Sequence, residues 1–233
     1  MPAPLRDPAV FPSFVAQATI AFDEAADGEP ERHFPGLPFP ASLASAVKKR
    51  QLEFLAGRSC AREALKRGAP EDAGHPIPIG ENREPLWPAG IVGAITHTHG
   101  YASAAIARAR HARGIGLDAE RWITDDRASG LSAQLANPGE VEAITEATGF
   151  SFGRALTLIF SAKETIFKAL YPEVRRYFGF HDAALVAADV ARGEFTATLL
   201  TTLTPGFVEG ARLVGRFEQD ERLVCTGMVV PAD

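Results

Sequence analysis

The sequence predicts an α+β fold made of two similar halves, each with a helix packed on antiparallel strands. A long helical pattern followed by short strands occurs early in the chain, and the same order occurs again later. The 233 residues are enough for two small domains. We therefore expect an N-terminal half over residues 1–110, a C-terminal half over residues 111–233, and a ligand-binding cleft between them.

The composition restricts the classes of function. Hydrophobic residues make up 46% and charged residues 23% of the chain, which is typical of a globular protein in solution. The net charge of −5 argues against a nucleic-acid binder that relies on overall positive charge. No apolar run approaches the roughly 18 residues that span a bilayer, and the N-terminus lacks a signal-peptide pattern. Two cysteines without metal-ligand spacing suit a reducing compartment, so we expect a cytoplasmic protein without nucleic-acid or membrane partners.

In the N-terminal half, residues 14–22 favour a strand, and a long helix is predicted from Ser42 or Ser45 to Gly68. The proline- and glycine-rich segment 27–40 between them is predicted to be irregular surface chain. Gly57 inside the helix costs about 1 kcal/mol relative to alanine. We therefore expect another segment to approach the helix backbone closely at Gly57.

The polar side of this helix is strongly basic although the protein as a whole is acidic. Either a solvated helix face or an anion-binding site would explain this pattern. The basic residues are Lys48, Lys49, Arg50, Arg58, Arg62, Lys66 and Arg67. Residues 77–88 then favour a short strand and a proline-constrained loop, and residues 91–95 and 101–107 favour strands, with Thr96 and His97 just beyond the first of them.

The C-terminal half begins with a strand over residues 114–120. Side chains alternate along a strand, so Gly116, Asp118 and Glu120 share one face and the apolar residues between them share the other. Two carboxylates at this spacing repel each other unless water screens them, they share a proton, or a hard cation lies between them. A strand with a wet outer face is the simplest explanation.

A second acidic position lies on a helix predicted over residues 152–170. Its Glu164 and Lys168 are one turn apart, where an ordinary ion pair is worth only a few tenths of a kcal/mol. Together with Asp118 and Glu120, Glu164 would supply the three oxygen ligands that suit Mg²⁺. Before this helix, residues 121–126 are predicted to be a loop, and Pro138 and Gly139 with Glu140 are predicted to open a short helix that runs through Thr148. Strands are predicted after it, over residues 184–189, 194–200, 211–219 and 222–230.

Other motifs receive less support. Residues 114–119 fit G-x-G-x-x-A, but a dinucleotide site needs a helix to open there, and Asp118 would repel a pyrophosphate unless a cation intervened. His97 and His99 lack the H-x-x-x-H spacing and the neighbouring cysteine of a zinc site, which leaves a structural or phosphate-contacting role for His97. No G-x-S-x-G or cysteine nucleophile motif supports an acyl-enzyme.

Residues 116–120 and 160–169 closely resemble the G-x-D-x-E and (F/W)-S-x-K-E-x-x-x-K signature of the 4′-phosphopantetheinyl transferases. Residues 49–62, 83–88 and 96–97 resemble the larger, pseudo-dimeric branch of this family, which serves siderophore and peptide synthetases. The matches run in order from about residue 48 to 170. Thr96 stands where the family usually has serine, and Ala119 replaces a more usual β-branched residue, but neither change removes a charge.

The resemblance implies an enzyme that transfers 4′-phosphopantetheine from coenzyme A to a serine hydroxyl of an apo carrier protein and releases adenosine 3′,5′-bisphosphate. It implies Mg²⁺, or Mn²⁺ in its place, bound by Asp118, Glu120 and Glu164. The base that takes the serine proton would be Glu164, acting through a metal-bound water, or Glu140. The implied coenzyme A contacts are Arg50 and Arg58 at the 3′-phosphate and adenine, Arg83 and His97 with Thr96 at phosphates, and Lys163 and Lys168 at the pyrophosphate.

By the same resemblance, the N-terminal half would hold the 3′-phosphate and adenine, and the C-terminal half the metal and the carrier protein. The expected partner of this monomer is an acyl, peptidyl or aryl carrier from fatty-acid, polyketide, peptide or siderophore synthesis. A second hypothesis is a non-catalytic module of the same fold that binds coenzyme A or a carrier protein. The intact set of mutually repelling charges argues against this module, because an abandoned site would be free to lose them.

Overall fold

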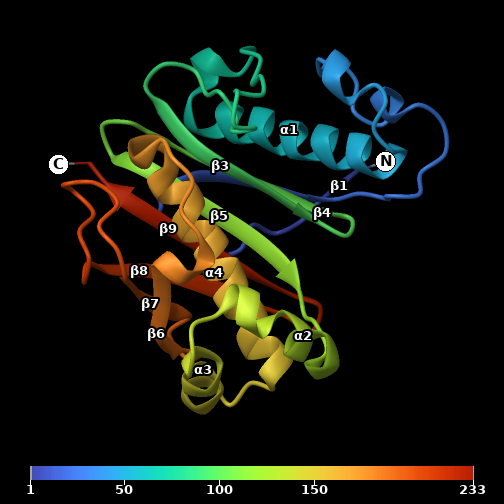
Figure 1. Cartoon of the computed structure of the whole chain (residues 1–233). Coiled ribbons are helices and arrows are strands. Elements are labelled where there is room, and N and C mark those ends of the chain that lie inside the picture. Colours follow the sequence, from blue (N-terminus) through green and yellow to red (C-terminus); the bar gives the residue numbers. More distant parts are fainter. Residues whose placement is uncertain (1, 233) are drawn as a thin grey trace. The chain divides into compact units, whose positions relative to one another are not determined.

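The computed structural model describes residues 2–232, which form two compact units (Figure 1). Unit 1 consists mainly of Pro12–Ile115, and unit 2 consists of Gly116–Val230 with the short segment Pro8–Phe11. Each unit combines helix with an antiparallel sheet. The predicted α+β fold class is therefore confirmed.

In unit 1, helix α1 (Lys48–Gly68) packs on a four-stranded sheet of order β1-β2-β4-β3. Leu52, Leu55 and Leu65 of the helix are buried against the small residues of β4. A Cβ atom at Gly57 would collide with the side chain of Ile95, which confirms the predicted close approach at this glycine. The strands are β1 (Ala3–Pro4), β2 (Ala16–Ala21), β3 (Ile91–Thr98) and β4 (Tyr101–Arg108).

Some predicted boundaries in unit 1 are wrong. Helix α1 begins at Lys48 rather than at Ser42 or Ser45, because Val47 is still extended and no serine side chain caps the helix. Strand β3 runs to Thr98, so Thr96 and His97 lie within it. The strand expected in residues 77–80 is reduced to an isolated bridge between Ile79 and Pro85. Short 3₁₀ turns lie at η1 (Pro30–Arg32), η2 (Ala41–Leu43) and η3 (Pro70–Asp72).

Unit 2 contains a five-stranded sheet of order β5-β9-β8-β7-β6, with α4 (Phe152–Val174) packed against it. The core contains Leu156, Ile159 and Ile166 of α4 together with Phe195 and Leu199 of the sheet. The strands are β5 (Ala112–Arg121), β6 (Ala183–Asp189), β7 (Glu194–Leu199), β8 (Arg212–Gln219) and β9 (Leu223–Pro231). The shorter elements are α2 (Asp125–Leu135), α3 (Glu140–Thr148) and the 3₁₀ turn η4 (Phe180–Asp182).

Helix α2 was not expected. The residues after β5 were predicted to be a loop, yet the Thr124 hydroxyl accepts a hydrogen bond from the Arg127 amide and caps a helix that opens with two aspartates. This is an ordinary helix-start signal, and it was missed because the stretch lacks apolar periodicity. Helix α4 also continues past Leu170 to Val174 although Pro172 lies within it.

Gly116 lets α4 lie directly on β5. A Cβ atom at this position would collide with the Thr165 carbonyl oxygen of the helix. The face of β5 that carries Gly116, Asp118 and Glu120 is therefore the face that α4 covers. Across residues 2–232, no helix combines the length and apolar character needed to cross a membrane.

Gly116→Ala is expected to lower the free energy of unfolding by about 1–3 kcal/mol, because the new methyl group has to push α4 away from β5. Urea unfolding of both proteins measures the difference. Gly130→Ala is the matched control, since Gly130 lies in α2 with no atom near its missing side chain. That variant should gain up to about 1 kcal/mol of helix stability. An equal effect of the two substitutions would contradict the contact between α4 and β5.

Candidate active site

Three carboxylates come from the two elements that Gly116 brings together. Asp118 and Glu120 lie on β5, and Glu164 lies on α4. Asp118 is only 3% exposed, and the neighbouring Leu117 and Ala119 are buried on the opposite face. The strand therefore has two buried faces near Asp118, and the wet outer face considered from the sequence is absent there.

Lys168 supplies the charge that balances Asp118. Its Nζ donates to Asp118 Oδ1 at 2.7 Å and to the Leu117 carbonyl oxygen at 3.1 Å. The other carboxylate oxygen of Asp118, Oδ2, accepts from the Ser161 hydroxyl at 2.9 Å. Among the described side chains, Lys168 forms an ion pair with Asp118 on the sheet. It forms no ion pair with Glu164, which lies one turn away on the same helix. The i,i+4 pair that the spacing suggested is thus replaced by a pair between helix and strand.

Burial and mutual repulsion shift the pKa values of these groups. Burial, and then the charges of Asp118 and Glu164, raise the pKa of Glu120 to about 8 against the opposing effect of Lys168. Burial also raises the pKa of Glu164, with Asp118 adding to the effect and Lys168 reducing it. For Lys168, burial favours the neutral amine, but the carboxylates led by Asp118 outweigh it and raise its pKa. At neutral pH Glu120 therefore holds a proton much of the time.

The donor chemistry of this cluster fits a hard divalent cation. Carboxylate oxygens are the ligands that Mg²⁺ prefers, and a cation would relieve the repulsion that now raises the pKa of Glu120. Within residues 2–232, however, no three His, Cys, Asp or Glu side chains stand close enough together to hold a metal as they are arranged. Binding would therefore bring these carboxylates closer together than they lie here.

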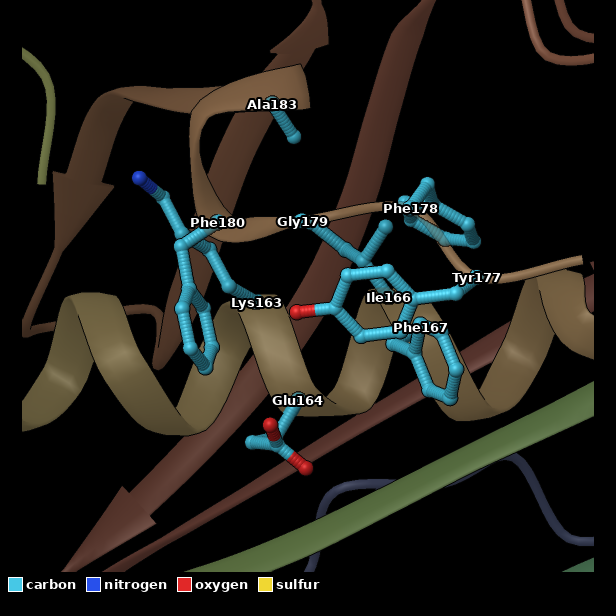
Figure 2. Close-up of a pocket in the computed structure, with 9 residues that line it drawn as sticks. All are labelled: Lys163, Glu164, Ile166, Phe167, Tyr177, Phe178, Gly179, Phe180 and Ala183. Carbon is cyan, nitrogen blue, oxygen red and sulfur yellow. The ribbon is translucent and has the colours of Figure 1, made fainter. Parts of the chain in front are cut away.

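A small aromatic cavity of about 90 Å³ lies beside Glu164. Figure 2 shows the rings of Phe167, Tyr177 and Phe178 on one side of it, with the Glu164 carboxylate extending from α4 away from Ala183. The remaining wall is formed by Lys163, Ile166, Gly179, Phe180 and Ala183. The cavity offers an apolar surface next to the carboxylate cluster.

Lys163 and Glu140 form a buried ion pair rather than a ligand-facing pair. Lys163 Nζ donates to Glu140 Oε2 at 2.7 Å and to the Leu135 carbonyl oxygen at 3.0 Å, and the two side chains are 3% and 2% exposed. Glu140 also accepts from the Asn137 amide and side chain and, through Oε1, from the Leu185 amide. Burial lowers the pKa of Lys163, although the charge of Glu140 opposes this. Both groups are thus committed to joining α3, α4 and β6.

In unit 1, the structure brings Arg50 and His97 together. Arg50 Nη1 donates to His97 Nε2 at 2.9 Å, and His97 Nδ1 lies 3.7 Å from Glu53 Oε2. Thr96 is buried on the opposite face of β3, and Arg83 is exposed on a loop in the left-handed region with φ of 68°. Thr96 and Arg83 therefore do not join Arg50 and His97 in this arrangement.

Arg58 is a buried cation of unit 1. It is 9% exposed and its guanidinium stacks 4.7 Å over the Phe54 ring, while burial and the nearby Arg50 charge lower its pKa to about 10. Its Nη2 donates weakly to the Pro78 carbonyl oxygen at 3.4 Å, and its buried Nε has no partner among the described atoms. A buried cation with an unsatisfied donor is what an anion would stabilise.

A cavity of about 290 Å³ opens beside Arg58. Arg62, one turn further along α1, and His75 add two more basic groups to its wall, and part of the irregular segment 27–40 also lines it. The full lining is Gly36, Leu37, Pro38, Arg58, Arg62, Ala73, Gly74, His75, Pro76 and Ile77. The i,i+4 spacing of Arg58 and Arg62 was the available signal in the sequence, whereas the positions of His75 and residues 36–38 depend on the fold.

Comparison with known proteins decides the family. Residues 39–107 match the 4′-phosphopantetheinyl transferase N-terminal domain, and residues 114–221 match the 4′-phosphopantetheinyl transferase superfamily. The chain is 39% identical to 4′-phosphopantetheinyl transferase Svp of Streptomyces mobaraensis, over 96% of this chain and 89% of that protein. The chain belongs to the 4′-phosphopantetheinyl transferase superfamily.

Two further relatives of the transferase are similar to it over most of its length. It is 32% identical to 4′-phosphopantetheinyl transferase PptT of Mycobacterium tuberculosis, over 93% of this chain and 96% of that protein. It is 38% identical to enterobactin synthase component D of Escherichia coli K12, over 65% of this chain and 68% of that protein. The expectation from the sequence motifs, an enzyme of this family, is confirmed.

The pH dependence of stability should reveal the carboxylate cluster of the transferase. A carboxyl group whose pKa is higher in the folded than in the unfolded state binds its proton more tightly when folded. The metal-free protein should therefore lose stability as the pH rises from about 4.5, the ordinary value for glutamate, to about 8. Thermal melts across this range measure the slope, which Glu120→Gln should flatten. A slope that this substitution leaves unchanged would contradict the environment described for Glu120.

Proposed function

We propose that the transferase moves 4′-phosphopantetheine from coenzyme A to a serine hydroxyl of an apo acyl, peptidyl or aryl carrier protein and releases adenosine 3′,5′-bisphosphate. Mg²⁺, or Mn²⁺ in its place, would be bound by Asp118, Glu120 and Glu164. The observation that carries this proposal is that these three carboxylates, of which Asp118 is buried and Glu120 and Glu164 are half-buried, lie near enough to one another on β5 and α4 to interact, with the ammonium group of Lys168 paired to Asp118. Such an excess of negative charge is costly unless a cation joins it.

A divalent cation in this cluster would neutralise charge on the diphosphate oxygens of coenzyme A. Lys168 would add a second positive charge there. Two of its three N–H groups contact Leu117 and Asp118 of the described chain, so the third could donate to a diphosphate oxygen. Glu164 would take the proton from the carrier's serine, because its carboxylate is only half-buried and lines the cavity beside this cluster. Glu140 fits this role less well, because its carboxylate is enclosed by hydrogen bonds from Lys163, Asn137 and Leu185.

The basic groups of unit 1 would hold the 3′-phosphate and the adenine end of coenzyme A. The unsatisfied Nε of Arg58 supports this assignment, and Arg50 with His97 offers a second cationic group. Arg83 and Thr96 would reach phosphates only after rearrangement. In unit 2, the aromatic cavity beside Glu164 would accept part of the uncharged pantetheine arm, because its walls are largely apolar.

The chain carries both the basic and the acidic groups of the proposed site, so we propose that it acts as a monomer. We also propose a cytoplasmic location, because its two cysteines are free thiols, as in a reducing compartment. The resemblance to enterobactin synthase component D suggests a siderophore pathway, while Svp and PptT carry names that specify no carrier. Peptide and polyketide synthesis are the other pathways that would require this modification.

Incubation of the purified transferase with coenzyme A, Mg²⁺ and several apo carrier proteins tests the proposed reaction. We expect each accepted carrier to gain the mass of one phosphopantetheine, as measured by intact-protein mass spectrometry, and EDTA to prevent the gain. A non-catalytic module would bind coenzyme A in calorimetry without changing any carrier, and that result would overturn the proposal.

Arg58→Ala should raise the KM for coenzyme A by about 10- to 100-fold with a much smaller change in kcat, because charge-assisted hydrogen bonds to phosphate contribute roughly 1.5–3 kcal/mol. Steady-state kinetics at saturating carrier measures both constants. Lys66→Ala is the matched control, since Lys66 is an exposed cation on the same helix that pairs only with Glu63 among the described residues. An unchanged KM with a collapsed kcat would contradict the role assigned to Arg58.

A further inference from the structure

Three buried hydroxyl groups form a chain behind the carboxylate of Asp118. Ser161 and Thr165 lie on α4 and Thr226 lies on β9, and all three residues are completely buried. Ser161 Oγ lies 2.9 Å from both Asp118 Oδ2 and Thr226 Oγ1, and Thr226 Oγ1 lies 2.7 Å from Thr165 Oγ1. Nothing in the sequence motifs indicated Thr226, which lies beyond residues 114–221 that match the superfamily.

The direction of these hydrogen bonds follows from the number of protons. A hydroxyl group has one proton to donate, and an ionised carboxylate can only accept. Ser161 therefore donates to Asp118, so the bond between Ser161 and Thr226 requires Thr226 to donate. Thr226 then has no proton to give to Thr165, so Thr165 donates to Thr226, at the hydroxyl oxygen and at the carbonyl oxygen 3.2 Å away. The chain runs in one direction, from Thr165 through Thr226 and Ser161 to Asp118.

This chain and Lys168 hold the two oxygens of Asp118 from different sides. Lys168 contacts Oδ1 while the hydroxyl chain ends on Oδ2, so the plane of the carboxylate is defined by both contacts. Thr226 Oγ1 also lies 3.0 Å from the Ser161 carbonyl oxygen, so its one proton is shared between the hydroxyl and the carbonyl oxygen of Ser161, which ties the β9 strand to the same turn of α4. Without Thr226, Ser161 could turn its proton to a carbonyl group one turn back in its own helix, as buried helical serines commonly do.

We propose that Thr226 is a positioning residue that orients the Asp118 carboxylate for the divalent cation through Ser161. The inference rests on the metal assignment made under the proposed function. Groups that orient a metal ligand typically change metal affinity or activity by about 10- to 100-fold when they are removed. Thr226 acts at one remove, because its hydroxyl contacts Ser161 and Thr165 rather than the carboxylate.

Direct binding of Mn²⁺ to the 233-residue protein, measured by electron paramagnetic resonance without coenzyme A or carrier, tests this role. Thr226→Val keeps the shape but removes the hydroxyl and should weaken Mn²⁺ binding about 10-fold or more. Thr226→Ser restores the hydroxyl and should stay within about threefold of the wild type. Thr157→Val is the matched control, since this buried α4 hydroxyl bonds to Gly153 and Ile123 away from Asp118, and it should leave Mn²⁺ affinity unchanged.

Two further variants distinguish a failure of the positioning role from a failure of the metal assignment. Ser161→Ala removes the same chain at its other end and should reproduce the loss even if Thr226→Val folds poorly. Asp118→Asn tests the metal assignment alone. Weaker Mn²⁺ binding in Asp118→Asn together with wild-type affinity in Thr226→Val and Ser161→Ala would overturn the positioning role and leave the proposed function standing. Unchanged Mn²⁺ affinity in Asp118→Asn would overturn the metal assignment and the positioning role with it.

Discussion

Asp118→Asn is expected to lower kcat/KM for carrier modification by roughly 100-fold or more, which corresponds to about 3 kcal/mol of transition-state stabilisation. Asparagine has nearly the same size and its oxygen can still accept from Ser161 or Lys168. The substitution removes the negative charge, however, and so weakens the attraction of this cluster for a divalent cation. Kinetics over a range of Mg²⁺ concentrations should show a higher metal requirement as well as the lower rate.

Asp126→Asn provides the control for this experiment. Asp126 is exposed in the first turn of α2, so the same chemical change should leave kcat/KM within about twofold of the wild type, since the charge is solvated there. If Asp118→Asn kept both the wild-type rate and the wild-type Mg²⁺ requirement, Asp118 would not be a metal ligand.

Glu140→Ala is expected to lower the free energy of unfolding by about 3–5 kcal/mol, because it leaves the buried Lys163 ammonium without its partner. The loss also leaves the Asn137 and Leu185 amides without an acceptor. Urea unfolding measures the change, and Glu142→Ala on the exposed side of α3 is a control that should shift stability by less than about 0.5 kcal/mol.

The same variant separates a structural role of Glu140 from a catalytic one. If Glu140 mainly joins α3, α4 and β6, the fraction of Glu140→Ala that remains folded at low temperature should retain most of its kcat. Full stability combined with a loss of turnover would instead identify Glu140 as the base. Lys163→Met combined with Glu140→Ala should cost less than the sum of the single changes, because no unpaired charge is then left buried.

Local patterns predicted most of the elements. The alternation of side chains over residues 114–120 predicted β5, and the Pro-Gly pair before Glu140 predicted the start of α3. The signature residues around Asp118 and Glu164 also identified the family, which the comparisons then confirmed. These features depend on neighbours a few residues apart, and a linear sequence displays such neighbours directly.

The partners of the charged groups could not be predicted in this way. The sequence placed Lys168 one turn from Glu164, but the packing of α4 on Gly116 pairs it with Asp118. The sequence offered Glu140 as a base, but the fold encloses Glu140 with Lys163. The sequence also gave no indication that Thr226 lies beside Ser161. Residue types and their order thus determined which elements form and which chemistry is present. The pairing of the charges was decided only when distant segments packed together, because a buried charge takes whichever partner the packing places within hydrogen-bonding distance.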